Sequence, residues 1–190
     1  MIIREKQSGD EWWGAEFSPC KRYRYRLWRE WDATLPNVVF CLMNPSTADE
    51  IENDPTIERQ TRRVARWVLD LDLKVGRVDV VNVFAYRETY SKKLHELYSR
   101  GHDLIGPEND AAILRACENA ELVICGWGST GELGNRGQNV YEMLRTSGVV
   151  PHAFRMNFDG SPSHPGRLAY DLLPVPMDPR DSCHPKMRRT

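Results

Sequence analysis

The sequence predicts an α/β domain built on a largely parallel sheet. Three apolar runs, at residues 37–43, 77–86 and 121–128, have the length of buried strands and are too short for helices. Segments with apolar residues at helical spacing lie between them, so strands and helices alternate along the chain. This alternation is typical of parallel strands that are joined by right-handed crossovers.

Length, charge and hydropathy limit the class of protein. The chain has 190 residues, which favours one domain, here predicted over residues 1–174, followed by a charged, proline-rich tail over 175–190. The 26 Lys and Arg residues nearly balance 27 Asp and Glu, so a formal net charge of −1 excludes strong overall attraction to nucleic acid or membranes. No apolar run approaches the roughly 18 residues of a transmembrane helix, and the N-terminus has no signal-peptide stretch. We therefore expect a cytoplasmic protein without a membrane partner.

The five cysteines form no C-x-x-C pair, so we expect free, buried thiols and neither a structural zinc ion nor an iron–sulfur cluster. No cofactor is expected either. An acidic run after the first core strand could hold a divalent ion, but its spacing is not that of an EF-hand loop. This run comprises Asp49, Glu50, Glu52 and Asp54. A metal-dependent hydrolase therefore stays open as a minor alternative.

The elements follow in order from these patterns. Residues 21–28 alternate basic and apolar side chains, which predicts an N-terminal edge strand or hairpin with one basic face. Asp54-Pro55 is a helix start, and apolar spacing predicts a helix from about 55 to 70. The arginines on its other face form a solvated face or contact a phosphate backbone; they are Arg59, Arg62, Arg63 and Arg66. Two further helices are expected after Gly106-Pro107 and over 137–146, and a fourth strand over 152–158.

Unusual residues follow the predicted strands and should meet at one edge of the sheet. Ligands of open α/β sheets bind beyond the carboxyl ends of the strands, so a site is expected here. Its residues would be Asn44, Pro45, Ser46 and Thr47 after the first core strand, Tyr86 after the second, Trp127 after the third, and Ser163 and His164 after the fourth. An Asn amide can orient a water or a planar heterocycle, although it can also cap its own turn. A His on a proline-confined loop can act as an acid or a hydrogen-bond donor.

Six motifs in one order, MNPSTADE, DPTI, VVNVFAY, GPEND, GWG and SHPGRL, resemble a bacterial and phage family known as domain of unknown function 1643. The resemblance covers residues from about 20 to 168. More distantly, the same layout looks like the uracil-DNA glycosylase superfamily. That resemblance implies a three-layer α/β/α sandwich around a central, mainly parallel four-stranded sheet.

The second resemblance also implies roles for individual residues. Asn44, before Pro45, would orient the attacking water, and the strand residue Asn82 would read the edge of a base. His164 would stabilise the anion that develops on the departing base, and its loop, with Arg167, would contact nucleic acid. Tyr86 or Trp127 would replace the aromatic side chain that usually stacks on the base.

Two functions from different classes follow. The first is an enzyme that binds a nucleobase and uses no metal ion. It would hydrolyse the N-glycosidic bond of a base, modified or not, in DNA or in a nucleoside. The alternative is a non-catalytic module that binds single-stranded nucleic acid or a nucleotide. Its surface would combine charge and stacking from Arg22, Arg24 and Arg26 with Tyr23 and Tyr25.

Overall fold

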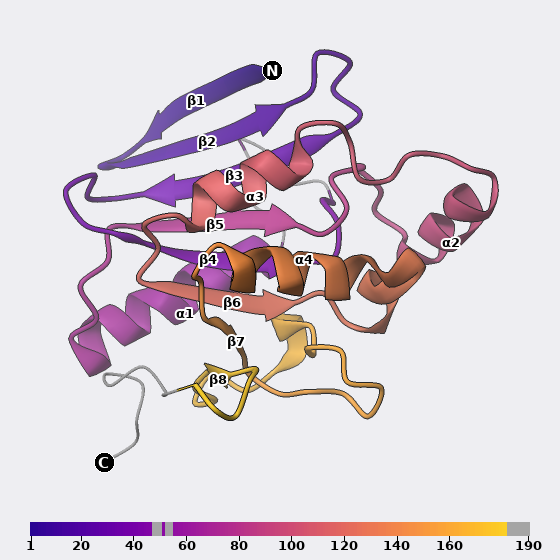
Figure 1. Cartoon of the computed structure of the whole chain (residues 1–190). Coiled ribbons are helices and arrows are strands. Elements are labelled where there is room, and N and C mark those ends of the chain that lie inside the picture. The colour runs from indigo at the N-terminus through magenta and orange to yellow at the C-terminus, as the bar shows by residue number, and fades with distance from the viewer. Residues whose placement is uncertain (47–50, 52–54, 182–190) are drawn as a thin grey trace.

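The computed structural model describes residues 1–46, 51 and 55–181 (Figure 1). The elements run in the order β1 (Ile2–Ser8), β2 (Glu11–Phe17), β3 (Arg24–Glu30), β4 (Asn37–Leu42), α1 (Pro55–Leu71), β5 (Arg77–Asn82), α2 (Ser91–Ser99), α3 (Asn109–Cys117), β6 (Leu122–Gly126), the 3-10 segment η1 (Ser129–Asn135), α4 (Arg136–Thr146), β7 (Pro151–Ala153), the 3-10 turn η2 (Pro165–Arg167) and β8 (Val175–Pro176). No helix in these described ranges is long and apolar enough to cross a membrane.

The described strands form one mixed sheet of eight, in the order β1-β2-β3-β5-β4-β6-β7-β8. The neighbours β5–β4, β4–β6 and β6–β7 are parallel. The neighbours β1–β2, β2–β3, β3–β5 and β7–β8 are antiparallel. The α/β class is thus confirmed, and the sheet as a whole is mainly antiparallel, with parallel pairing limited to β5, β4, β6 and β7. The antiparallel character arises because the N-terminal strands extend the sheet outward from β5 without any crossover helix.

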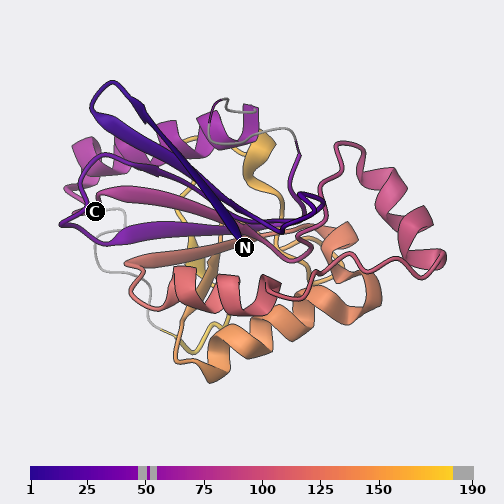
Figure 2. The same cartoon turned by 90° about the horizontal axis from the view of Figure 1, so that it is seen from above.

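Helices cover both faces of this sheet, with α1 on one side and α3 and α4 on the other (Figure 2). Successive side chains of β4 point to opposite faces of the sheet. Phe40 packs in the cluster that contains Val64 of α1, whereas Cys41 packs in the cluster that contains Ile113 of α3. All six residues of β4 are buried, which explains why residues 37–43 read as a continuous apolar run.

β3 is not the predicted edge strand, because it lies between β2 and β5. Its register against β2 shifts, so that Glu16 opposes Arg26 while the next residue, Phe17, opposes Arg24. Tyr25 is therefore the extra residue of a β-bulge. The bulge breaks the two-residue alternation, so Arg24 and Arg26 do not share a face.

The contacts of these residues agree with that assignment. Tyr25 packs on Ala112 of α3, and the Arg26 guanidinium binds Asp79 at 2.6 Å. Arg24 is only 2% exposed. The predicted basic face with Arg22, Arg24 and Arg26 is therefore wrong, since only Arg22 among the three is exposed.

Part of the predicted C-terminal tail belongs to the sheet. β8 pairs with β7 through Ala153 and Val175. Just after it, Asp178 accepts hydrogen bonds from the Arg180 guanidinium, which holds the pKa of that carboxyl well below its usual range. Residues 182–190 of the tail lie outside the described residues.

A buried carboxylate joins the antiparallel and parallel halves of the sheet. Asp79 of β5 has no solvent exposure and accepts hydrogen bonds from Arg26 of β3 (2.6 Å), Asn37 of β4 (2.5 Å) and Arg77 (2.8 Å). The Asn37 amide also donates to the Ala116 carbonyl oxygen of α3 at 3.0 Å. Asp79 thus links three strands, and Asn37 connects them to α3.

Replacing Asp79 with Asn should therefore destabilise the fold by about 3 kcal/mol, because it removes the buried charge that binds Arg26 and Arg77 and leaves them only their longer contacts with Glu16 (3.5 Å) and Glu30 (3.2 Å). The free energy of unfolding in urea measures this loss. Asp70→Asn is the matched control, since Asp70 is 66% exposed and lies 4.0 Å from Arg66; it should change stability by under about 1 kcal/mol. Equal effects of the two substitutions would contradict the role given to Asp79.

Candidate functional site

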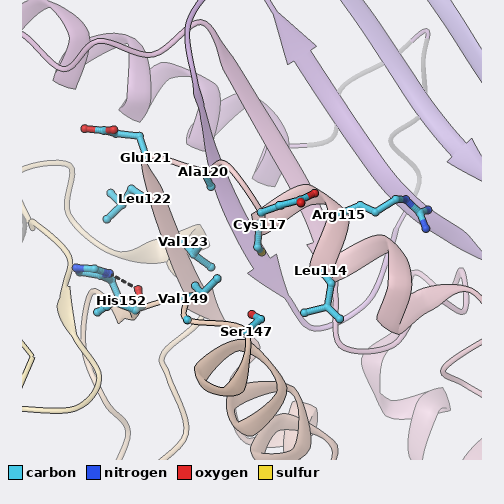
Figure 3. A pocket seen from close by; sticks show the side chains of 13 residues that line it. Leu114, Arg115, Cys117, Ala120, Glu121, Leu122, Val123, Ser147, Val149 and His152 are labelled. Atoms are coloured by element: carbon cyan, nitrogen blue, oxygen red, sulfur yellow. Dashed lines mark hydrogen bonds between the residues drawn. The ribbon is translucent and has the colours of Figure 1, made fainter.

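Two cavities open at opposite edges of the sheet. The larger, of about 750 Å³, lies between the C-terminal ends of α3 and α4 and the beginnings of β6 and β7 (Figure 3). Much of its wall is apolar, with Leu114, Leu122 and Val149 among the side chains drawn. The smaller, of about 330 Å³, lies beyond the carboxyl ends of β4 and β5 on the α1 face. Ligands of α/β sheets bind at that edge, and the smaller cavity holds the more diverse polar groups.

We call the smaller cavity the C-edge pocket. Its described lining residues are Arg24, Leu42, Met43, Asn44, Ser46, Thr56, Ile57, Val80, Asn82, Glu88, Thr89 and His164. Three predicted site residues from three separate segments, Asn44, Asn82 and His164, thus border one pocket. Ser46 joins them, whereas Thr47 lies outside the described residues.

Asn44 lies two residues after the end of β4, and backbone carbonyl groups of nearby loops hold its side chain. Its Nδ2 donates to the Glu88 carbonyl oxygen at 2.6 Å and to the Pro45 carbonyl oxygen at 3.0 Å. Because two carbonyl oxygens take the amide hydrogens, Oδ1 is left as the atom that accepts from a ligand or water. Pro45 does not line the pocket; its carbonyl oxygen also accepts from the Glu88 N–H at 3.0 Å, which ties the two loops together.

Asn82 is the last residue of β5 and is 2% exposed. Its Oδ1 is buried and has no hydrogen-bond partner among the described residues. An unpaired buried acceptor costs roughly 1–3 kcal/mol, which a ligand N–H group would recover. Asn82 therefore marks a position that favours a hydrogen-bond donor on the ligand.

His164 precedes the turn η2, and its Nδ1 accepts from the Gly166 N–H at 3.2 Å. This contact caps η2 and places the ring proton of a neutral imidazole on Nε2, which makes Nε2–H the donor of the ring. A Cβ on Gly166 would lie 3.0 Å from Nδ1, so a glycine here lets the ring approach the backbone. The glycine at position 166 is thus explained by the orientation of His164.

Two contacts fix the His164 loop against the rest of the molecule. At the end of β6, a Cβ on Gly126 would lie 2.7 Å from Cδ of Pro165, so only glycine allows this close approach. On the other side, Arg63 donates to the carbonyl oxygens of Leu168 (3.0 Å) and Ala169 (2.9 Å). Arg63 is fully buried, and burial together with Arg59 lowers its pKa to about 10. This residue is therefore not on the solvated helix face considered from the sequence.

The two predicted stacking residues lie outside the pocket. Trp127 is 2% exposed, packs in the core beside α4, and donates from Nε1 to Glu132 at 2.7 Å. A Cβ on Gly131 would lie 2.5 Å from Cβ of Trp127, so the glycines of this segment serve to pack the indole. Tyr86 packs edge-on against Tyr23, with ring centroids 5.9 Å apart. None of the described pocket residues is Phe, Tyr or Trp.

The remaining predicted residues are placed as follows. Ser163 is buried and donates to Asn157 Oδ1 at 2.5 Å, so it stabilises the preceding turn. Arg22 and Arg167 are exposed and do not line the pocket. Arg26 is held by Asp79 inside the sheet.

Several lining residues are not predicted from the sequence. The alternating pattern places Arg24 on an outer basic face. The bulge at Tyr25, which turns Arg24 toward the pocket, leaves no signal in such a pattern. Thr56 lies in the first turn of α1, and Glu88 and Thr89 follow Tyr86 at the same sheet edge. The acidic run at 49–54 falls outside the described residues. Within the ranges that are described, no group of three or more His, Cys, Asp or Glu could hold a metal ion.

The cysteines differ in exposure, which corrects the expectation of buried thiols. Cys41, Cys117 and Cys125 are buried, and burial raises the pKa of Cys41 to about 12. Cys20 is exposed, and hydrogen bonds from Ser18 and Arg22 lower its pKa to about 7. Cys183 lies outside the described residues.

Alkylation by iodoacetamide should therefore modify Cys20 first, with a rate that rises through a midpoint near pH 7 because the thiolate is the nucleophile. Peptide mass mapping across pH 5–9 measures this. Arg22→Gln should move the midpoint upward, toward the ordinary cysteine value of about 8.5. A midpoint already near that value in the unmodified protein would contradict the assigned environment.

Comparisons with known proteins extend these observations. No curated protein and no solved structure matches the chain. One family model, described as "Protein of unknown function (DUF1643)", matches residues 24–166, a segment that contains β3, the pocket residues and the His164 loop. The resemblance of the six motifs to this family is thereby confirmed, and the chain belongs to the DUF1643 family.

Proposed function

We propose that the protein binds a nucleobase in the C-edge pocket and hydrolyses its N-glycosidic bond. The observation that carries this proposal is that Asn44, Asn82 and His164, from three separate segments, border one pocket. These residue types supply a water-orienting acceptor, a reader of the base and a hydrogen-bond donor for the leaving group.

In the proposed reaction, Asn44 Oδ1 accepts a hydrogen bond from water and holds it beside the sugar carbon C1′. The water oxygen forms a bond to C1′ while the C1′–N bond breaks, and the electron pair of that bond leaves on the base. The proton lost by the water passes to solvent, and the base anion takes up a proton from solvent. Asn44 positions the water and does not itself accept the proton, since an amide is a very weak base.

The other two side chains, Asn82 and His164, would bind the leaving base. Asn82 Oδ1 accepts from an N–H group on the base, which satisfies the buried acceptor described above. His164 donates from Nε2 to the oxygen or nitrogen on which negative charge develops. A donor that is already oriented by its neighbours costs no reorganisation when the charge develops.

The distant resemblance to uracil-DNA glycosylases supports the same assignment, because it implies an Asn-Pro loop, a strand asparagine and a His-Pro loop in this order. The absence of an aromatic side chain among the described lining residues is a difference; here Leu42, Met43 and Ile57 would contact the base faces. The alternative of a non-catalytic module that binds single-stranded nucleic acid or a nucleotide has less support, because only part of its predicted surface is exposed. Tyr25 and Arg24 are buried, and Arg26 is bound to Asp79.

Single-turnover assays on oligonucleotides and nucleosides with uracil, hydroxymethylated or deaminated bases test this proposal. We expect release of the free base from at least one substrate. Asn44→Ala and His164→Ala should each lower the rate roughly 10²–10³-fold, since each removes an oriented group that acts in the transition state.

Matched controls are Asn139→Ala and His95→Ala, which replace exposed residues that do not line the pocket and should leave the rate unchanged. Circular dichroism establishes that each variant is folded. Release of no base from any substrate, or a rate that Asn44→Ala leaves intact, would refute the proposed reaction.

A further inference from the structure

Two exposed aromatic side chains lie on separate segments that continue from the C-edge pocket. Tyr90 is 64% exposed and directly follows the lining residue Thr89. Phe158 is fully exposed, on a turn that leads into Ser163 and His164. We infer that the substrate base is carried by a single-stranded polynucleotide, and that these two rings stack on bases that flank the one in the pocket. This inference rests on the proposed function and names the form of its substrate.

The turn that carries Phe158 is held by hydrogen bonds on both sides of this residue. The Asn157 N–H donates to the Ser161 carbonyl oxygen at 2.8 Å, and Ser163 Oγ donates to Asn157 Oδ1 at 2.5 Å. Asp159 Oδ1 accepts from the Ser161 N–H at 3.0 Å. An aromatic side chain on such an ordered turn loses little conformational entropy when a ligand packs on it, so Phe158 is preorganised for binding.

The base of this turn lies at the same edge of the sheet as the pocket. Gly128, two residues beyond the end of β6, donates its N–H to the Pro162 carbonyl oxygen at 2.8 Å. His164, which lines the pocket, follows two residues after Pro162. Six residues of chain span at most roughly 20 Å, so Phe158 is within reach of a base a few nucleotides from the pocket.

Tyr90 belongs to the other segment, immediately before α2. Glu88 and Thr89 line the pocket, and the Tyr90 N–H donates to Glu88 Oε1 at 3.0 Å, which ties this residue to the pocket wall. Lys93 Nζ lies 5.2 Å from the centroid of the Tyr90 ring, so a cation accompanies it. Of the α2 side chains whose exposure is described, only Leu94 is buried, and Figure 1 shows this helix projecting beyond the carboxyl ends of β5 and β6. Tyr90 is thus open to a ligand that continues past the pocket.

A single-stranded polynucleotide fits these features better than a free nucleoside, a duplex or a protein. Each base has two flat faces, and stacking on an aromatic side chain tolerates any base sequence. A free nucleoside has no second base for either ring, and in a duplex the faces are already covered by neighbouring bases. Because Phe158 is fully exposed, none of the described side chains packs on its ring to form the contiguous apolar core of a protein interface.

Fluorescence anisotropy tests the inference with a fluorescein-labelled, 12-nucleotide single strand that carries one uracil, hydroxymethylated or deaminated base at its centre. Phe158→Ala and Tyr90→Ala should each weaken binding roughly 5- to 150-fold, the range for loss of one base–aromatic stack, and Phe158→Trp should retain it. Trp12→Ala is the matched control and should leave binding unchanged. Trp12 is 48% exposed, but it pairs with Glu30 of β3, which pairs with Arg77 at the beginning of β5, so it lies at the opposite edge of the sheet.

The outcomes separate this inference from the proposed function. Release of base from free nucleosides, without binding of the single strand, would overturn the inference and leave the proposed function in place. Strand binding that depends on both rings, with no release of base from any substrate, would refute the hydrolysis and keep the nucleic-acid surface. Strand binding that neither alanine substitution weakens, or tighter binding of a duplex than of the single strand, would overturn the inference. Self-association that Phe158→Ala abolishes in sedimentation experiments would instead assign the turn to a contact between copies of the chain.

Discussion

The buried carboxylate of Asp79 is the interaction on which the arrangement of the sheet depends. It accepts hydrogen bonds from side chains on β3 and β4 and from Arg77 on its own strand β5, so it joins an antiparallel pairing to a parallel one. A slip of β3 by one residue would remove Arg26 from this carboxylate and leave buried charges unpaired, at a cost of several kcal/mol. The register of β3 is thereby tied to the position of Arg24 two residues earlier. The pocket at one edge of the sheet depends on an ion pair in its interior.

The wall of the pocket that carries His164 is held in place by two glycines, which allow close contacts, and by Arg63. Gly126 allows Pro165 to pack against the end of β6, and Gly166 allows the His164 ring to accept from the backbone. Arg63 binds carbonyl oxygens of the segment that follows η2. Since α1 also contributes Thr56 to the pocket, one helix both lines the site and anchors the histidine loop. A rigid setting of this kind suits catalysis by oriented neutral groups, which act only when they are correctly positioned.

The balanced net charge is consistent with such a site. Two of the arginines that alternation and helical spacing place on surfaces are bound within the fold: Arg26 by Asp79, and Arg63 by carbonyl oxygens. The described lining of the C-edge pocket contains one side chain of each sign, Arg24 and Glu88. The proposed recognition of one base would then depend on local hydrogen bonding in the pocket, without strong attraction to a whole duplex.

The sequence by itself determined several strands and a helix, and it predicted that residues after the strands meet at one edge of the sheet. Apolar runs located β4, β5 and β6, and helical spacing with Asp54-Pro55 located α1. The rule that ligands lie beyond strand ends brought Asn44 and His164 to one edge, whereas Asn82 was assigned to the site only by the resemblance to uracil-DNA glycosylases. These inferences succeed because they depend on local periodicity and on the direction of parallel strands.

Only the tertiary structure decided which neighbouring side chains face the pocket. A single inserted residue at Tyr25 reverses the face of Arg24, and the glycines around Trp127 draw the indole into the core. Neither effect has a local signature, because a bulge or a close approach is set by the partner strand or helix and not by the segment itself.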